Sequence, residues 1–388
     1  MIRIMKNLLL KWFFIVQIPL YYVFRIFPVD SRKILITNYY GKGYGDHAKY
    51  IVERLLGSGL KIVWAVKKGQ EGTLPTEIKP VKYNSVAYIY ELVTSKVWID
   101  NCRKNISVRK RKNQFYIQTW HGGVALKRVE ADVEHSLNEV YVMHAKHDSR
   151  LADVFISNGR FCSEIYRRAF WYSGEIKEFG SPRCDILFNN SSQLNEKVKQ
   201  HFRLQPEMRL ALYAPTFRAD KEIKIYDLDC HGIIDALQKK FGGKWIILVR
   251  LHPIIANKSG RLLYSERVVN ASDYPDMYEL LAVSDVLITD YSSSMFEAIL
   301  ADKPVFLYAT DINDYVQDRG FYFDLRDLPF PLAENNDQMI KIIERFDAGL
   351  YQSEIQQFRN ALGLVDDGKA SHKVAQLIKQ VVEGREGV

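Results

Sequence analysis

Short apolar runs alternate with amphipathic stretches along most of the chain. Runs rich in Ile, Leu, Val and aromatic residues predict buried strands, and apolar residues spaced three or four apart predict helices. The expected strands cover residues 33–38, 61–66, 97–100, 115–120, 154–157, 209–215, 245–253, 285–290 and 304–309. The expected helices cover residues 47–56, 85–94, 160–170, 233–241, 276–283, 336–346, 352–362 and 369–384, with a helical turn at 149–153. This alternation predicts the α/β class, with parallel sheets covered on both faces.

A polar segment without strand pattern, residues 189–208, separates two such series. We therefore expect two Rossmann-like domains, residues 31–190 and 205–365, whose parallel sheets face a cleft. The last segment, residues 366–388, is expected to be a helix that could cross back to the first domain. Parallel sheets bind ligands outside the carboxyl ends of their strands, so those ends are the places to search for a site.

The first 30 residues are rich in Leu, Ile, Phe, Tyr and Trp and carry scattered basic residues. A membrane-spanning helix needs roughly 20 mostly apolar residues, and here Lys11, Gln17, Pro19 and Arg25 interrupt the run. No small-residue cleavage site of a signal peptide follows. The pattern favours an amphipathic segment, residues 1–30, that associates peripherally with the cytoplasmic face of the membrane. The alternatives are a spanning helix and a helix buried in the fold or in an oligomer contact.

The composition narrows the class of partner. Of its 388 residues, 47% are hydrophobic, and this content excludes a disordered protein. The formal net charge of +8 suits anionic partners. Only the basic run at residues 103–112 could support nucleic-acid binding, and it is more typical of a solvated loop or of a contact to anionic lipid or acceptor diphosphate. The four cysteines, Cys102, Cys162, Cys184 and Cys230, form no CxxC pair, which predicts free thiols in a reducing compartment.

Polar residues follow several of the expected strands in the first half. His121 ends the run at 115–120 and is followed by Gly122, Gly123 and the cationic Lys127. An imidazole can take a proton from a hydroxyl near neutral pH, and glycines permit a substrate to approach the backbone. A structural histidine is the alternative. The glycine-rich loop around Gly43, after the first strand, is a weaker candidate that a plain turn would also explain.

Cationic residues follow two strands of the second half. Arg218 lies just beyond the strand at 209–215. Arg250 and His252 alternate, so they would point to one face if the strand at 245–253 continued through them. Two cations on one face suit a phosphate, whereas the alternative is a solvent-facing strand end.

A run of three serines opens a helix after the strand at 285–290. Ser292 and Ser293 precede Glu297 in that helix. Serines there are usually helix caps, but the free N–H groups and the positive end of the helix dipole also favour an anion. The pair Asp227 and Asp229 precedes another helix and gives little support for a metal site. The residues therefore indicate phosphoryl transfer by cations, helix dipoles and a base, without a dedicated metal.

Several stretches together resemble one family. QTWHG…LK, GSPRCD, APTFR, RLHP and SDVLITDYSSSMFEAILADKPVFLY are similar to motifs of the CDP-glycerol glycerophosphotransferase family of teichoic acid synthesis, over residues 33–365. The resemblance implies a GT-B-like transferase at the cytoplasmic face of the membrane. It also implies transfer of glycerol phosphate from CDP-glycerol to a hydroxyl of an undecaprenyl-diphosphate-linked glycan acceptor, with release of CMP and no cofactor.

The resemblance also implies roles for individual residues. His121 would be the base on the acceptor hydroxyl, with Gly122, Gly123, Lys127 and Gly43 on the acceptor side. Arg250 and His252 would stabilise the donor diphosphate, Ser292 and Ser293 would bind phosphate, and Glu297 and Arg218 would lie on the donor side. The sequence reads HGGVALK where the family more often reads HGTPLK, which leaves the acceptor open.

Three other readings remain. CDP-ribitol or a nucleotide sugar would use a site of the same kind. A membrane-bound scaffold in a wall-polymer complex would keep the fold without catalysis. The sequence also leaves open one addition or many, wall teichoic acid or capsule, and a homo-oligomer.

Overall fold

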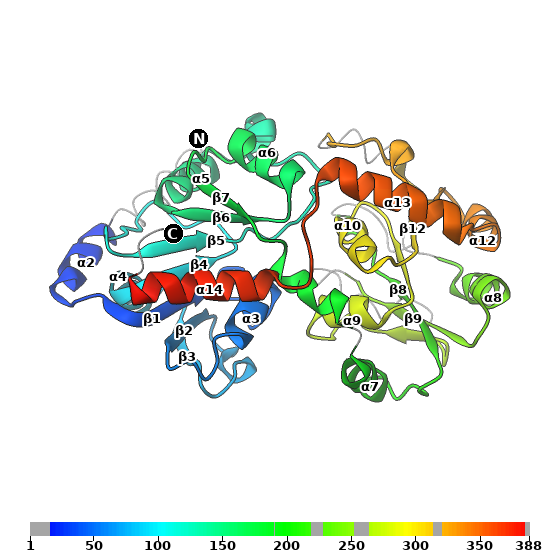
Figure 1. Ribbon diagram of the computed structural model, residues 1–388, viewed down its shortest axis with the longest axis horizontal. Coiled ribbons are helices and arrows are strands. Elements are labelled where there is room, and N and C mark those ends of the chain that lie inside the picture. Colours follow the sequence, from blue (N-terminus) through cyan, green and yellow to red (C-terminus); the bar gives the residue numbers. More distant parts are fainter. Residues whose placement is uncertain (1–15, 190, 219–227, 252–263, 313–319, 385–388) are drawn as a thin grey trace, which may run out of the picture. The chain divides into compact units, whose positions relative to one another are not determined.

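A computed structural model describes residues 16–189, 191–218, 228–251, 264–312 and 320–384. The chain divides into two compact units (Figure 1). The first unit comprises the described residues through Gly122, then Val129–Asp185, then those from Leu364 on. The second unit comprises Gly123–Arg128 and Ile186–Gly363. The polar segment expected to separate the domains contains helix α7 (Ser192–His201) and belongs to the second unit.

The first unit is built on a seven-stranded parallel sheet in the order β3-β2-β1-β4-β5-β6-β7. Its strands are β1 (Asp30–Thr37), β2 (Lys61–Val66), β3 (Lys79–Lys82), β4 (Ser95–Asp100), β5 (Phe115–Gln118), β6 (Val154–Ser157) and β7 (Glu175–Glu178). Its helices are α2 (Ile18–Val23), α3 (Asp46–Glu53), α4 (Val86–Thr94), α5 (Glu139–Leu151), α6 (Arg160–Ala169) and α14 (Ala370–Glu383), with 3-10 turns η1 (Phe24–Ile26), η2 (Glu71–Thr73), η3 (Glu130–Ser136) and η4 (Pro182–Phe188).

Successive strand residues point to opposite sides, so this sheet has apolar side chains on both faces. Helices cover each face. Ile34 and Ile36 of β1 lie in a core cluster with α3 and α14, whereas Leu35 lies in a second cluster with α4 and Tyr21 of α2. Helix α14, at the end of the chain, lies along the first sheet in Figure 1. The last helix therefore completes the core of the first unit.

The second unit contains a six-stranded parallel sheet in the order β10-β9-β8-β11-β12-β13. Its strands are β8 (Arg209–Tyr213), β9 (Trp245–Val249), β10 (Val268–Asn270), β11 (Val286–Thr289), β12 (Val305–Tyr308) and β13 (Leu332–Ala333). Besides α7, its helices are α8 (Cys230–Phe241), α9 (Met277–Val283), α10 (Ser294–Ala298), α12 (Asn336–Glu344) and α13 (Ala348–Leu362), with 3-10 turns η7 (Ile299–Ala301) and η8 (Leu325–Asp327). The predicted class of two parallel-sheet α/β domains is confirmed.

The N-terminal segment is described only from Val16 on, so half of the expected amphipathic segment lies outside the described residues. Tyr21 of α2 is buried at 2% exposure against the first sheet, and Ile26 is 77% exposed. Among the described residues, no helix combines the length and the apolar character needed to cross a bilayer. The described part of the segment thus has one face packed on the first unit and an apolar face left open.

Each sheet has one point at which the strand order reverses. In the first unit the chain proceeds outward from β1 to β3 and then returns to the other side of β1 with β4. In the second unit the same happens at β8 and β11. Ligands of open α/β sheets bind outside the carboxyl ends of the strands at such a switch point. The candidate residues are therefore best judged by their distance from these two places.

Candidate active site

The switch point of the first unit is held together by two asparagines. Asn101, directly after β4, donates from its side chain to Asn38 Oδ1 at 2.7 Å, and its own Oδ1 accepts from the Tyr39 backbone N–H at 2.9 Å. These bonds tie the carboxyl end of β4 to that of β1. Asn101 is not among the predicted site residues, although it is a polar residue directly after a strand, as several predicted residues are.

His121 joins this switch point through its ring. Strand β5 ends at Gln118, two residues earlier than expected, because Trp120 adopts a positive φ of 54° and donates its N–H to the Gln118 side chain at 2.9 Å. The turn places His121 Nδ1 2.7 Å from the Asn101 carbonyl oxygen. A carbonyl only accepts, so Nδ1 carries the proton and neutral His121 has its lone pair on Nε2.

The surroundings keep His121 uncharged. The His121 ring lies over the Trp120 ring at a centroid distance of 4.0 Å and beside Tyr39 at 5.6 Å. Burial is the main reason why its pKa falls below the usual value, since burial disfavours the imidazolium. A neutral imidazole with a lone pair on Nε2 has the form a general base requires.

Two charged residues support the same corner. Arg183 Nη1 donates to the His121 carbonyl oxygen at 2.9 Å and to both oxygens of Asp46 at 3.1 Å. Burial opposes ionisation of Asp46, but the Arg183 charge and further hydrogen bonds outweigh it, so its pKa lies below the usual range. The sequence did not predict this pair, because no local motif connects two residues that are 137 positions apart.

Backbone strain is concentrated in the loop after β1. Tyr39, Tyr40 and Asp46 have positive φ values of 41°, 56° and 53°. Gly41 and Gly43 also have positive φ, and a Cβ on Gly41 would lie 2.8 Å from Tyr83 Cβ. Strained residues of this kind often occur at functional sites. The glycines here satisfy the fold, so their presence is no evidence of a ligand.

Two of the expected acceptor-side residues fall in the second unit, contrary to the expectation that they belong to the domain at 31–190. Gly123 and Lys127 lie in the Gly123–Arg128 segment, which pairs with another stretch of the second unit. Lys127 forms an antiparallel bridge with Phe321, and the Leu126 carbonyl accepts from the Tyr322 N–H at 2.8 Å. Gly122 remains in the first unit, where its carbonyl accepts from Tyr166 at 3.4 Å.

At the switch point of the second unit, Arg218 is held by two carboxylates. Its guanidinium lies 2.8 Å from Asp290 and 3.1 Å from Asp311, and it stacks on the Tyr291 ring at 4.7 Å. Its side chain is 5% exposed. Burial works against the charge, but the carboxylates outweigh it and raise the pKa of Arg218. A phosphate would have to compete with both carboxylates, which argues for a structural role.

Arg250 follows β9, which ends at Val249 rather than continuing to residue 253. Its Nη1 donates to the carbonyl oxygens of Ala271 and Tyr274, at 3.2 and 2.6 Å. Burial lowers the pKa of Arg250. His252 lies outside the described residues. Since β9 ends before Arg250, the shared strand face expected for Arg250 and His252 stays a prediction.

The serine turn follows β11 directly. Ser292 accepts at Oγ from the Ser294 N–H at 3.3 Å, and Ser293 occupies the N-cap position of α10 without a side-chain capping bond. Both are partly exposed. Glu297 is 5% exposed and accepts from Tyr278 at 2.9 Å, so it is committed to the interior of the second unit. Two serines at this turn are thus accessible, and the carboxylate behind them is not.

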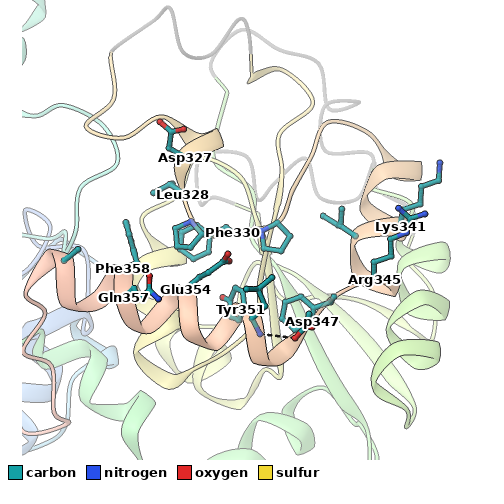
Figure 2. A pocket seen from close by; sticks show the side chains of 16 residues that line it. Asp327, Leu328, Phe330, Lys341, Arg345, Asp347, Tyr351, Glu354, Gln357 and Phe358 are labelled. Atoms are coloured by element: carbon teal, nitrogen blue, oxygen red, sulfur yellow. Dashed lines mark hydrogen bonds between the residues drawn. The ribbon is translucent and has the colours of Figure 1, made fainter.

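The second unit also has a hollow of about 820 Å³, shown in Figure 2. Phe330, Tyr351 and Phe358 line it, with Lys341 and Arg345 at one side. Its lining comes from the segment before β13, from the end of α12 and from α13, and it includes none of the candidate residues. Within the described ranges, no group of three or more His, Cys, Asp or Glu side chains is arranged to hold a metal ion.

The chain is similar to known proteins over most of its length. Residues 20–380 match the family described as CDP-Glycerol:Poly(glycerophosphate) glycerophosphotransferase, and the chain belongs to this family. It is 32% identical to the teichoic acid poly(glycerol phosphate) polymerase of Staphylococcus epidermidis, over 92% of this chain and 51% of that protein. It is 29% identical to the teichoic acid glycerol-phosphate transferase of Staphylococcus aureus, over 96% of this chain and 99% of that one.

Related proteins with other names and solved structures also match. The teichoic acid poly(ribitol-phosphate) polymerase of Bacillus spizizenii is 30% identical, over 92% of this chain and 58% of that protein. A structure of the wall teichoic acid polymerase TagF superposes with a TM-score of 0.82 at 30% identity, covering 100% of this chain and 98% of that chain. A TagF variant soaked with CDPG has a TM-score of 0.81 at 30% identity and 99% coverage of both chains. The chain spans about half the length of the polymerase from Staphylococcus epidermidis.

Proposed function

We propose that this protein transfers glycerol phosphate from CDP-glycerol to a hydroxyl of an undecaprenyl-diphosphate-linked acceptor and releases CMP. The product would be a teichoic acid or a related cell-surface polymer. Membership of the glycerophosphotransferase family supports this reaction class. The single structural observation that carries the proposal is the His121 ring, whose Nδ1 bond to the Asn101 carbonyl leaves a basic Nε2 at a switch point.

The reaction needs a base and a way to neutralise phosphate charge. The acceptor oxygen forms a bond to the phosphorus that carries glycerol, while the bond from that phosphorus to the bridging oxygen breaks. CMP leaves with the bridging oxygen and its electron pair. His121 Nε2 takes the proton of the attacking hydroxyl. A general base in suitable geometry typically accelerates such a reaction by about 10²–10⁴-fold. Phosphoryl transfer otherwise depends on positioning and electrostatic stabilisation.

The second unit would supply the donor contacts. Ser292 and Ser293 lie partly exposed at the carboxyl end of β11, beside the switch point. Their hydroxyls and the backbone N–H groups of the turn suit phosphate oxygens. Arg250 follows β9, which is separated from β11 by β8, and its half-buried guanidinium adds positive charge. These residues are the donor side of the proposal, with His252 kept as an expectation from the family resemblance.

An assay of CMP release tests the reaction. Purified protein is incubated with CDP-glycerol and a short-chain lipid-diphosphate disaccharide. The proposal predicts acceptor-dependent CMP, reduced to background in the His121→Ala variant. Equal CMP release by both proteins would contradict it, and no CMP from a folded wild-type protein would favour the scaffold reading.

The donor is the open part of the specificity. The relative from Bacillus spizizenii is named for ribitol phosphate, so CDP-ribitol is a reasonable second donor. Ranking CDP-glycerol, CDP-ribitol and UDP-sugars by their shift of the thermal transition separates the three, because a ligand that binds only the native state raises Tm. The proposal predicts the largest shift with CDP-glycerol, and a larger shift with either other donor would replace it.

We further propose that the protein binds the cytoplasmic face of the membrane through its N-terminal segment. Its exposed apolar residues are Val16, Tyr22, Val23, Ile26 and Phe27. The end of the basic run lies alongside, since Arg111 donates to the Phe27 carbonyl at 2.7 Å and the adjacent Lys112 is exposed. Apolar and basic groups together favour an anionic lipid surface.

Co-sedimentation with vesicles tests this location. Wild-type protein should bind phosphatidylglycerol vesicles better than phosphatidylcholine vesicles, and Ile26→Ser should weaken that binding. Leu350→Ser, on exposed α13 of the second unit, is the matched control and should bind as wild type does. Equal losses in the two variants would contradict a specific role for the N-terminal segment.

A further inference from the structure

We propose that Arg183 and Asp46 are a positioning pair for His121, which fixes its backbone and sets its proton affinity from opposite sides. This inference rests on the proposed role of His121 as the base. The Arg183 guanidinium bonds the His121 carbonyl oxygen and both Asp46 oxygens through one nitrogen. The side chains of Arg183 and Asp46 are 4% and 5% exposed, so solvent screens their charges little.

The pair also connects two strand ends. Asp46 begins α3, where its φ of 53° is strained, and its carboxylate accepts from the His47 N–H at 2.6 Å. The Arg183 backbone N–H contacts His47 Nδ1 at 3.5 Å. One carboxylate and one guanidinium therefore link the loop after β1, the turn η4 and the turn after β5 that carries His121. Moving either partner would move the His121 backbone and with it the Nδ1 bond to Asn101.

Charged groups face His121 from three directions. Asp46 favours the imidazolium, while Arg183 and Arg103, from the segment after β4, disfavour it. His47 lies close by but is itself uncharged, because burial lowers its pKa to about 3. Tyr39 faces the ring from the loop after β1, and its burial raises its pKa, so it is neutral as well. Asp46 and Arg183 therefore shift the pKa of His121 in opposite directions.

These opposite senses define the test. The general base acts when neutral, so kcat/KM rises with pH through the pKa of His121 in the free enzyme. Arg183→Gln removes a positive charge, which raises that pKa and moves the acid limb of the profile to higher pH. Asp46→Asn removes a negative charge and moves the acid limb to lower pH. The double variant should lie between the two.

Two further variants separate charge from geometry. Arg183→Lys keeps the charge, but its side chain ends one atom short of Nη1 and cannot keep the contacts of that nitrogen. The acid limb should therefore stay close to its wild-type position while kcat falls ~10- to 100-fold through misplacement of the base. Arg150→Gln, on an exposed part of α5, should leave both the limb and kcat unchanged. A pair that only stabilised the fold would lower activity without moving the limb in opposite directions.

A second readout does not depend on turnover. The ¹⁵N and ¹³C resonances of the His121 ring, followed against pH without substrate, report its pKa directly. We expect an upward displacement in Arg183→Gln and a downward one in Asp46→Asn, both in folded protein. If these displacements occur but no variant and no wild type releases CMP, the proposed function fails and the pair stands. Displacements in the same direction, or none in either variant, would overturn the pair.

Discussion

The two switch points use the same topology but arrange their charges differently. In the first unit, a paired Arg183 and Asp46 stand behind His121, whose Nε2 keeps a free lone pair. In the second unit, the guanidinium of Arg218 is itself enclosed by Asp290 and Asp311. Ser292 and Ser293 of the serine turn are partly exposed there.

This difference suits the two switch points to different chemical tasks. A lone pair at the end of β5 can accept a proton, whereas hydroxyls and backbone N–H groups after β11 can hold an anion. Arg183 and Arg218 are both paired with buried carboxylates, so their charges are compensated within their own units. Strand-end position alone therefore identifies the region of a site, and the partners of each side chain decide which residues act within it.

The largest effect is expected from removing the lone pair. His121→Ala should reduce kcat/KM by about 10²–10⁴-fold, the usual contribution of a general base. The free energy of unfolding should fall by about 0.5–1.5 kcal/mol, since the variant loses the hydrogen bond of the ring to the Asn101 carbonyl. His121→Gln, which retains a donor for the Asn101 carbonyl, is the control for geometry and should be as inactive. Activity within a few fold of wild type in His121→Gln would exclude His121 as the base.

Removing the compensated arginine of the second unit should affect stability instead. Arg218→Ala leaves two buried carboxylates without their partner, which costs about 3–5 kcal/mol of the free energy of unfolding. Arg267→Ala, which breaks an exposed pair with Asp235, should cost only ~0–1 kcal/mol. Denaturant unfolding of both variants provides the comparison. A stable Arg218→Ala protein with a greatly raised KM for the donor would restore the direct phosphate contact.

A smaller effect is expected at the serine turn. A hydrogen bond to a charged group contributes about 1.5–3 kcal/mol, so Ser293→Ala should raise the KM for CDP-glycerol by roughly tenfold or more. Ser191→Ala removes the N-cap of α7 and should cost ~1 kcal/mol of stability without changing KM. Steady-state kinetics with varied donor distinguishes them. An unchanged donor KM in Ser293→Ala would remove the turn from the donor site.

The smallest effect concerns the glycine after His121. The backbone of Gly122 is outside the left-handed region, and a Cβ there would meet Trp120 only at 3.6 Å. Gly122→Ala should therefore change the free energy of unfolding by less than about 0.5 kcal/mol. If an acceptor approaches this backbone, its KM should rise a few fold. An unchanged acceptor KM would assign Gly122 to the turn alone.

Much of the fold followed from the sequence, because buried strands such as residues 61–66 and 154–157 are continuous apolar runs. The four edge strands, β3, β7, β10 and β13, were missed, since short sequences such as KPVK and EIKE carry little apolar pattern. Helix α5 was expected only as a turn, because Asp148 and Ser149 interrupt its apolar face. They are buried there by bonds to Arg103, a partner distant in sequence.

The candidate site was predictable in part for the same reason. His121 and the serine turn follow strands that the pattern identifies, so their region could be found. The enclosure of Arg218, the Nδ1 contact of His121 and the Arg183–Asp46 pair depend on residues brought together only by the sheets. The ends of β5 and β9 were placed too late, at residues 120 and 253 instead of 118 and 249. The shared strand face expected for Arg250 and His252 stays a prediction, because β9 ends before Arg250 and His252 lies outside the described residues.

In the proposed reaction, His121 removes the proton of the acceptor hydroxyl that receives glycerol phosphate. The most direct test of this role is mass spectrometry of a defined lipid-diphosphate disaccharide after incubation with CDP-glycerol. The account predicts acceptor that has gained glycerol phosphate units with wild-type protein and unmodified acceptor with His121→Gln. Acceptor modified to the same extent by both proteins, or left unmodified by wild-type protein that releases CMP, would contradict it.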